Sequence, residues 1–323
     1  MSALAQDHGH PFSSGGEPRS GVPSAPANCR DACNICGQRF DDSIRRVAVR
    51  CNIRKFRDQV FHMWRCPRCR CIHCREIVHL DTYYEGYGTK DQRLDFFSKL
   101  AYSRLLARFR AAGLRPKQRV LDYGCGSGNL VRYLHHRGYS QAVGFDPYGA
   151  ADGAGNPAIL KTDSFDFICM QDVIEHVEDP RPVVERLASL LRPQGALLIG
   201  TPSADEISLD DPIKHLHHLH APYHLHLYTR DALLAMGRAA GLVAERTYRR
   251  FYAETPFFGM NEAFFRRYVM RLDDCIDSAV EAPRVGMILR SPGLLFHGTF
   301  GYLYSPRHSV TVVFRKPGTD RSA

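Results

Sequence analysis

Hydrophobic and polar positions change their spacing several times along this chain. Short, nearly continuous apolar runs bounded by turn residues predict buried strands at 119–124, 141–146, 165–171 and 196–201. Between these runs, apolar residues recur at helical spacing over 94–109, 130–134 and 183–191. Alternating strands and helices are typical of a parallel sheet with crossover helices on both faces. The pattern therefore predicts an α/β fold with a doubly wound, mostly parallel sheet.

Later elements follow the fourth predicted strand. Thr229 is placed to cap a helix that ends at Gly241. Late strands are expected at 242–252 and 309–316, the last as an antiparallel partner in the sheet. Between them, 257–307 is rich in Phe, Tyr and Leu and is predicted to be a helical insertion. Both a lid over a substrate and a cap that packs only on itself fit this composition.

These patterns divide the chain into regions. Residues 1–28 are rich in Gly, Ser and Pro and lack the apolar run of a secretory signal or membrane helix, so we expect a disordered tail and a cytoplasmic protein. A cysteine-rich module is expected at 29–80. The α/β domain is expected at 81–256 and 308–317, with 257–307 inserted before its last strand.

Eight of the 11 cysteines lie in one stretch of 46 residues. In a protein without an export signal, clustered thiols usually hold metal rather than form disulfides. Two C-x-x-C knuckles can each present two thiolates to one structural zinc ion, and their cysteines are Cys33, Cys36, Cys66 and Cys69. Cys71 and Cys74 form a rival second knuckle. Further alternatives are a redox role and ligands drawn from Cys29, Cys51, His62 and His73.

Positive charge is concentrated in the same module. Residues 30–75 hold 12 basic and 4 acidic residues, so eight of the nine net positive charges lie there. A basic module can bind the phosphates of nucleic acid. Arginines that offset thiolate charge and solvate a small domain fit the same count.

A glycine-rich turn follows the first predicted strand, in the run Val-Leu-Asp-Tyr-Gly-Cys-Gly-Ser-Gly at 120–128. Asn129 stands where a dinucleotide fold would have its third glycine, and Asp122 would repel a pyrophosphate. An acid at this point suits a cationic ligand. The run resembles the first motif of the class I S-adenosylmethionine-dependent methyltransferases. The resemblance implies that the cofactor lies against Asp122, Gly124, Cys125, Gly126 and Gly128.

The next predicted strand ends at Asp146, about 20 residues after the glycine loop, where a carboxylate can accept hydrogen bonds from both ribose hydroxyls. The family uses an acid there for this purpose. The 18 residues between Asp146 and Phe165 are too few for the usual helix and third strand, which we expect to be shortened. The adenine contact is unassigned, with Asp163 as one candidate.

Two further segments, 164–180 and 191–202, resemble the fourth motif and the following strand of the ubiquinone-methyltransferase-like branch of this family. The resemblance implies a seven-stranded-type Rossmann-like sheet, with Gln171 and Asp172 at the cofactor and a Glu175-His176 pair following.

Methyl transfer to a hydroxyl or a carbon requires removal of a proton. Candidates are Glu175 and His176, together with a stretch at 215–226 that holds six histidines. Relatives place a histidine of this stretch near the acceptor, which favours His224 or His226. Asp172, Glu175, His176 and one of these histidines are also apt ligands for a divalent cation at the active site, although a solvated or packing role is commoner for most such histidines.

The two knuckles followed by an α/β domain also resemble methyltransferases with an amino-terminal zinc-binding domain. That resemblance implies an S-adenosylmethionine-dependent enzyme acting on a small-molecule or carrier-linked acceptor in secondary, sugar or envelope metabolism. The main alternative is an RNA methyltransferase that grips RNA with the basic zinc module, although the fourth motif lacks the Asn/Asp-Pro-Pro-aromatic run expected for base nitrogens. A non-catalytic zinc-binding adaptor is the third reading, against which the intact Asp122, glycines and Asp146 argue.

Overall fold

The fold is described from a computed structural model, which covers residues 29–78, 83, 94–148, 155–279 and 281–318. The tail expected at 1–28 lies outside the described residues. Over the described ranges, the helices are all too short or too polar to cross a membrane.

The main sheet has six strands among the described residues, in the order β5-β4-β6-β7-β10-β9. Their bounds are β4 Val120–Tyr123, β5 Ala142–Phe145, β6 Phe165–Gln171, β7 Leu191–Pro202, β9 Val243–Tyr248 and β10 Ser309–Arg315. Strands β5, β4, β6 and β7 run parallel, and β10 is antiparallel to both β7 and β9. The predicted doubly wound, mostly parallel sheet is confirmed, including its antiparallel last strand.

The sheet has six strands among the described residues, one fewer than the seven-stranded type that the resemblance implies. Between β5 and β6 the described chain forms only a short 3-10 turn, η2 Pro157–Ile159. The segment is too short for a full crossover helix and a further strand, so the shortened third strand expected between Asp146 and Phe165 is not formed among the residues described there.

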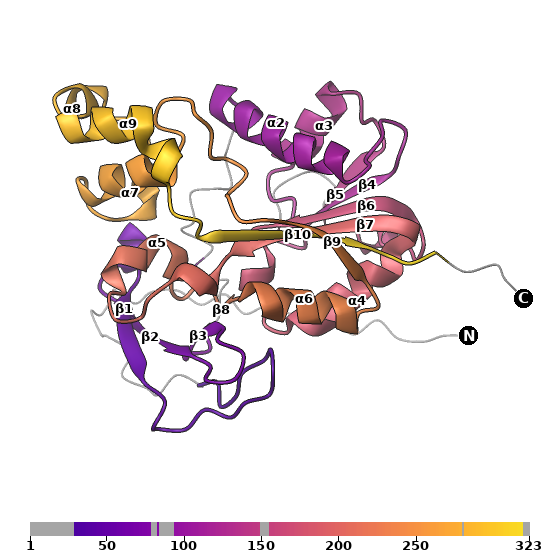
Figure 1. The fold of residues 1–323 in the computed structure, drawn as a ribbon, viewed down its shortest axis with the longest axis horizontal. Helices are drawn as coiled ribbons and strands as arrows, with labels where there is room; N and C mark the ends of the chain where they lie inside the picture. The colour runs from indigo at the N-terminus through magenta and orange to yellow at the C-terminus, as the bar shows by residue number, and fades with distance from the viewer. Residues whose placement is uncertain (1–28, 79–82, 84–93, 149–154, 280, 319–323) are drawn as a thin grey trace, which may run out of the picture.

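Helices cover both faces of the sheet (Figure 1). On one face lie α2 Phe96–Ala111 and α3 Asn129–His136, and on the other lie α4 Pro180–Leu190 and α6 Arg230–Ala239. Thr229 caps α6 as predicted, its side chain accepting a hydrogen bond from the Ala232 N–H. In β6, Phe167 and Cys169 pack into the core of one face, while Ile168 and Met170 pack into the other. Burial on both faces explains the continuous apolar runs of the parallel strands.

A second, antiparallel sheet is built mostly from the cysteine-rich region. Its order is β1-β2-β3-β8, with β1 Arg46–Arg50, β2 Val60–Arg65, β3 Ile72–Cys74 and β8 His226–Leu227. Strand β8 comes from far beyond the boundary predicted at residue 80. The core beneath this sheet likewise joins Met63 and Ile72 to Leu219 and Tyr223. The cysteine-rich region and the α/β domain therefore share one sheet and one core.

The insertion at 257–307 is helical, as predicted. It contains α7 Glu262–Met270, η6 Ile276–Ala279, α8 Val285–Leu289 and α9 Pro292–Tyr304. A small core of its own holds these helices together, formed by Phe264, Tyr268, Val269, Ile288 and Leu294. Between η5 Ile213–His215 and β8 lies the short helix α5 Leu216–Leu219, which carries part of the histidine-rich stretch.

Candidate active site

A cavity of about 1390 Å³ opens at the carboxyl ends of β4, β5 and β6. β4 has β5 on one side and β6 on the other, so the chain reverses its direction of travel across the sheet at β4. Open α/β sheets bind their ligands in the crevice at such a switch point. The position and size of the cavity make it the candidate active site.

The glycine loop forms one wall of this cavity. Gly124, Gly126 and Gly128 have φ angles of 83°, 51° and 74°, in the left-handed region that favours glycine. A Cβ on Gly124 would lie 2.3 Å from Cγ2 of Val173, whereas a Cβ on Gly126 would meet no atom within 4 Å. The loop is therefore packed tightly behind Gly124 and open at Gly126, where a ligand can approach the main chain. Gly128 caps α3 and does not line the cavity.

Three carboxylates, Asp122, Asp146 and Asp172, define what we call the carboxylate end of the cavity. Asp146 accepts hydrogen bonds of 2.9 Å from the N–H groups of Gly126 and Tyr148. Burial and the charge of Asp146 raise the pKa of Asp122 to about 7, and burial raises the pKa of Asp172 to about 6. A cationic ligand or one rich in hydroxyl donors would favour the ionised carboxylates.

The end of β6 continues the cavity wall. Gln171 donates a hydrogen bond of 2.9 Å from Nε2 to Asp172, whose φ is 56°. Glu175 is buried and accepts a hydrogen bond of 2.8 Å from the Thr201 hydroxyl. Burial raises the pKa of Glu175 well above its ordinary value. Gln171, Glu175 and Cys125, all predicted at the site, line the cavity.

Histidines also line the cavity, and we call the part formed by His176, His218, His224 and His308 its histidine end. Nδ1 of His176 lies 2.9 Å from the carbonyl oxygen of Tyr223, and Nδ1 of His224 lies 2.7 Å from that of His218. A carbonyl oxygen only accepts, so each Nδ1 carries the proton and each Nε2 has the lone pair when the ring is neutral. Burial lowers the pKa of His176 to about 4 and that of His224 well below 6.5. Both rings are neutral bases at neutral pH, with centroids 4.9 Å apart.

Two other sequence candidates lie outside the cavity. His226 lies in β8, where its Nε2 donates to the carbonyl of Glu178 at 3.1 Å and its Nδ1 lies 2.9 Å from Nδ1 of His73. Asp163, the candidate adenine contact, forms an ion pair of 2.7 Å with Lys316. Strand pairing with β3 turns His226 into the shared core, so only His224 of the two predicted histidines reaches the cavity.

Several cavity residues carried no sequence signal. Tyr102 comes from α2, Tyr252 and Glu254 follow β9, Glu262 begins α7, and His308 precedes β10. The rings of Tyr102 and Tyr252 stack with their planes 9° apart and their centroids 6.5 Å apart. Only the folded sheet brings these distant segments together, and no local motif marks any of them.

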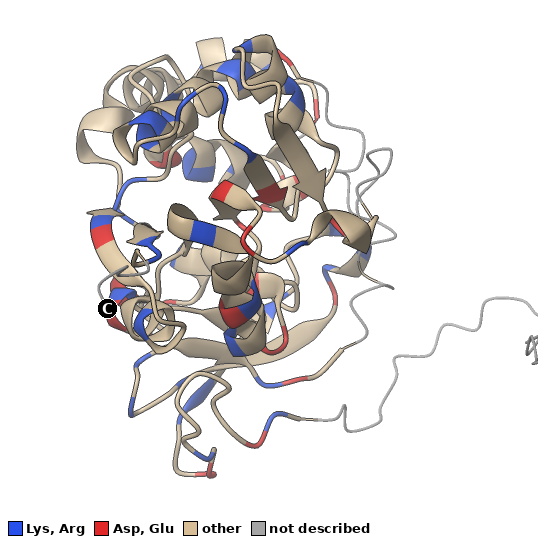
Figure 2. Ribbon diagram, turned by 90° about the vertical axis from the view of Figure 1, so that its right-hand side faces the viewer, with Lys and Arg blue, Asp and Glu red and all other residues tan. Residues whose placement is uncertain are grey.

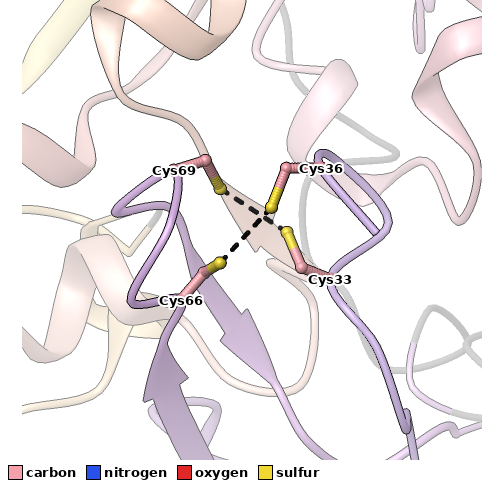
Figure 3. Close-up of side chains that lie close together, drawn as sticks. All are labelled: Cys33, Cys36, Cys66 and Cys69. Carbon is pink, nitrogen blue, oxygen red and sulfur yellow. Dashed lines mark hydrogen bonds between the residues drawn. The ribbon is translucent and has the colours of Figure 1, made fainter. Parts of the chain in front are cut away.

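Away from the cavity, four cysteine side chains point toward one another (Figure 3). Sγ of Cys33 lies 3.5 Å from that of Cys69, and Sγ of Cys36 lies 3.5 Å from that of Cys66. All four sulfur atoms lie within 4.8 Å of one another. Four thiolates about 2.3 Å from a tetrahedral zinc would be about 3.8 Å apart, so the spacing suits this ion.

The two knuckles share a backbone conformation. Gly37 and Arg70, each following the second cysteine of a knuckle, have φ angles of 74° and 63°. Each donates its N–H to the carbonyl of the knuckle's first cysteine, at 2.8 Å for Gly37 and 3.0 Å for Arg70. The rival cysteines are not part of this group of four: Cys71 lies next to Thr229, and Cys74 lies next to Glu76.

The arginines of the cysteine-rich region contact the rest of the protein. Arg30 pairs with Glu178 at 2.5 Å, Arg50 pairs with Asp274 at 2.8 Å, and Arg54 pairs with Asp273 at 2.6 Å. Arg65 donates to the carbonyl of Ile207 at 2.6 Å. Figure 2 shows Lys and Arg interspersed with Asp and Glu along the ribbon. Much of the local positive charge is thus used in contacts within the chain.

Comparison with known proteins decides the family. A family model described as a methyltransferase domain matches residues 95–247, which run from the start of α2 into β9 and include the cavity's glycine loop. These residues belong to the class I S-adenosylmethionine-dependent methyltransferases. The methyltransferase domain is thus formed by the same residues that build the carboxylate end.

Curated relatives match part of the methyltransferase domain. The chain is 31% identical over 110 residues to the ubiquinone biosynthesis O-methyltransferase of Aeromonas salmonicida, covering 28% of this chain and 46% of that protein. It is 28% identical over 142 residues to the malonyl-[acyl-carrier protein] O-methyltransferase of Porphyromonas gingivalis, covering 39% and 51%. The chain thus spans about half the length of the curated relatives it matches.

Among solved structures, the chain is similar to a putative sarcosine dimethylglycine methyltransferase from Galdieria sulphuraria. The identity is 18%, the TM-score is 0.44, and the match covers 73% of this chain and 97% of that one. A likeness at this level adds nothing to the assignment of the methyltransferase domain.

Proposed function

We propose that this protein transfers a methyl group from S-adenosylmethionine to an oxygen or carbon atom of a small-molecule or carrier-linked acceptor. The observation that carries the proposal is a single cavity whose two ends differ in chemistry, with carboxylates and open glycine backbone at one end and the neutral rings of His176 and His224 at the other. The first suits a cationic nucleoside and the second suits an acceptor that must lose a proton.

The carboxylate end fits the cofactor on two observations. The main chain is open at Gly126. The pKa of the buried Asp122 is raised, and a cationic ligand beside it would lower that pKa again. We assign Asp122 to the amino acid part of the cofactor and Asp146 to its ribose hydroxyls, with Gly124, Cys125, Gly126, Gln171 and Asp172 completing the wall. When bound, S-adenosylmethionine supplies a methyl group on a positively charged sulfur.

The histidine end would handle the acceptor proton. We assign His176 as the general base, with His224 as its neighbour and the second candidate. The Tyr223 carbonyl fixes the tautomer of His176, and burial keeps its ring neutral. Glu175, held by Thr201, would orient this part of the wall. Such a base removes the acceptor proton and contributes on the order of 10²–10⁴ to the rate.

The acceptor class rests on the size of the cavity and on the named relatives. A volume of about 1390 Å³ exceeds the ~300–1,000 Å³ of a typical ligand pocket, which leaves room for an acceptor beside the cofactor. Met260 and Phe265 of the insertion line the cavity and would cover the acceptor. One relative is named for ubiquinone biosynthesis and another for malonyl-[acyl-carrier protein], and these names are consistent with the small-molecule and carrier-linked classes.

We further propose one structural zinc ion bound by Cys33, Cys36, Cys66 and Cys69. Four thiolates close a tetrahedral coordination sphere, which leaves no position for a substrate. The ion would stabilise the small sheet, whose strand β8 contacts the turn Ile174–His176 at the histidine end.

RNA methylation is the alternative with the clearest test, although the internal pairing of Arg30, Arg50 and Arg54 leaves less charge for phosphates. The full chain is incubated with S-adenosylmethionine carrying a labelled methyl group and with separate small-molecule, protein and RNA fractions. We expect label in the small-molecule or carrier-protein fraction, absent with Asp146→Ala protein. Label in RNA alone would replace our proposal, and label in no fraction would support the non-catalytic adaptor.

A further inference from the structure

Three histidines from two parts of the chain meet at the edge of the histidine end. His215 ends η5, His218 lies on α5, and His308 immediately precedes β10. One nitrogen from each lies within 4.8 Å of the other two. His215 and His308 are more than nine-tenths buried, while His218 and His308 line the cavity.

Glu262, the first residue of α7, orients two of these rings. His308 Nδ1 lies 2.6 Å from Glu262 Oε1, and His218 Nε2 lies 3.5 Å from the same oxygen. Burial would raise the pKa of Glu262, but its contacts with His218 and His308 outweigh that effect and lower the pKa to about 2. An ionised carboxylate accepts hydrogens from these two nitrogens, so the lone pairs fall on His308 Nε2 and His218 Nδ1. A carboxylate behind a histidine is the usual outer partner of a metal-binding imidazole.

Two ring nitrogens in this group lack partners. Nδ1 of His215 and Nδ1 of His218 are buried without a hydrogen bond to any described residue. A buried polar atom without a partner carries a free-energy cost that a ligand would remove. The neighbouring group of Glu175, His176 and His224 differs in this respect, because Thr201, Tyr223 and the His218 carbonyl already bind its polar atoms.

We propose that His215, His218 and His308 bind one divalent first-row transition metal ion, with zinc as the best match, in the wall of the cavity. Three imidazoles are the ligand set of open zinc sites, in which the fourth position takes water or substrate. His218 and His308 line the cavity, which places the open position there. Nitrogens about 2.0–2.1 Å from zinc would lie about 3.3 Å apart, so binding draws the three rings together.

The charges around the group permit a cation. His215 is neutral at neutral pH, because burial and nearby positive groups, Lys214 and Arg266 among them, lower its pKa to about 4. Those groups oppose a cation, and the ionised Glu262 offsets part of their charge. If the protein has the proposed function, the open metal position would bind the oxygen of the acceptor hydroxyl and lower the pKa of that hydroxyl. Only this role in the reaction rests on the proposed function.

The test is metal binding by the full chain, measured without cofactor or acceptor. Protein purified with zinc is treated with a mild chelator, and the labile site is refilled with Co²⁺. We expect two metal equivalents per chain before chelation, one of them resistant. The refilled Co²⁺ should show visible absorption without a thiolate charge-transfer band, since its ligands are imidazoles. A single chelator-resistant equivalent, or thiolate bands only, would overturn the proposal.

Variants locate the site. His308→Gln should weaken Co²⁺ binding at the labile site at least 100-fold, and Glu262→Gln should weaken it about 10- to 100-fold, as for other outer partners of metal ligands. His217→Gln, in the same histidine-rich stretch but outside the group, is the matched control and should keep the site. Loss in the control but not in His308→Gln would contradict the assignment. Because none of these readouts needs methyl transfer, they stand apart from the test of the proposed function.

Discussion

The two ends of the cavity differ in charge and in how the chain builds them. The carboxylate end places Asp122, Asp146 and Asp172 around an open glycine backbone, and burial raises the pKa of two of them. The histidine end places His176 and His224 in a buried setting that keeps their rings neutral. An anionic end suits a cationic cofactor, and a neutral basic end suits proton removal. Desolvation thus acts on both ends: it raises the pKa of the acids at one end, an effect that a cationic cofactor would counter, and it keeps the bases unprotonated at the other.

The largest expected effect is on stability, which should fall more around the histidine end than around the carboxylate end. Cys33→Ser/Cys36→Ser protein should lose its zinc, and structural zinc contributes about 10–16 kcal/mol in zinc-finger peptides, as much as a typical domain's whole stability. We expect amide hydrogen exchange to accelerate first in β1, β2, β3 and β8 and in the histidine stretch, and less in β4 to β6. Cys29→Ser, an exposed cysteine outside the cluster, is the control. Unchanged exchange in the double variant would count against structural zinc.

The next effect is on the rate of methyl transfer, which should depend on the histidine end, while cofactor affinity should not. His176→Ala should lower methyl transfer at least 100-fold, because it removes the proposed base, while the dissociation constant for S-adenosylmethionine changes less than about threefold. Single-turnover transfer and calorimetry give the two values. If only His224→Ala lowers the transfer rate without changing the dissociation constant, His224 is the base. If both single variants transfer methyl at the full rate, neither histidine acts in the reaction.

At the carboxylate end, Asp146→Ala should weaken S-adenosylmethionine binding at least tenfold, about 1.4 kcal/mol. The variant loses the proposed ribose contacts and the carboxylate that accepts the Gly126 and Tyr148 N–H groups. Asp163→Ala, outside the cavity, is the matched control and should bind normally. An unchanged dissociation constant for Asp146→Ala would refute the ribose assignment.

The smallest effect concerns pH. The pKa of Asp122 in the folded protein, about 7, lies above the ordinary value of 3.8, so the free protein should lose stability as pH rises from about 4 to 7. A cationic ligand favours the ionised carboxylate, so S-adenosylmethionine should bind about tenfold tighter at pH 8 than at pH 6, releasing a proton. Titration calorimetry in buffers of different ionisation enthalpy measures both the affinity for S-adenosylmethionine and the number of protons released. Asp122→Asn should abolish the pH dependence, and its persistence in that variant would point to another group.

The two ends also differ in how far the sequence predicts them. Asp122, the glycines and Asp146 lie close along the chain at strand ends, so periodicity and motif spacing place them together. His308, Glu262 and Tyr252 reach the cavity only because β10 inserts between β7 and β9 and the helical insertion folds back, and no local pattern encodes that arrangement. His226 shows the same limit, since its pairing with β3 depends on a strand that is more than 150 residues away.

The central claim is that the carboxylate end holds S-adenosylmethionine, and equilibrium binding tests it most directly. Calorimetric titration of the full chain with S-adenosylmethionine should give one site per chain, with affinity lost in an Asp122→Asn/Asp146→Ala protein that keeps the wild-type circular dichroism spectrum. Absence of binding to the folded wild-type chain, or equal binding by the double variant, would contradict the account.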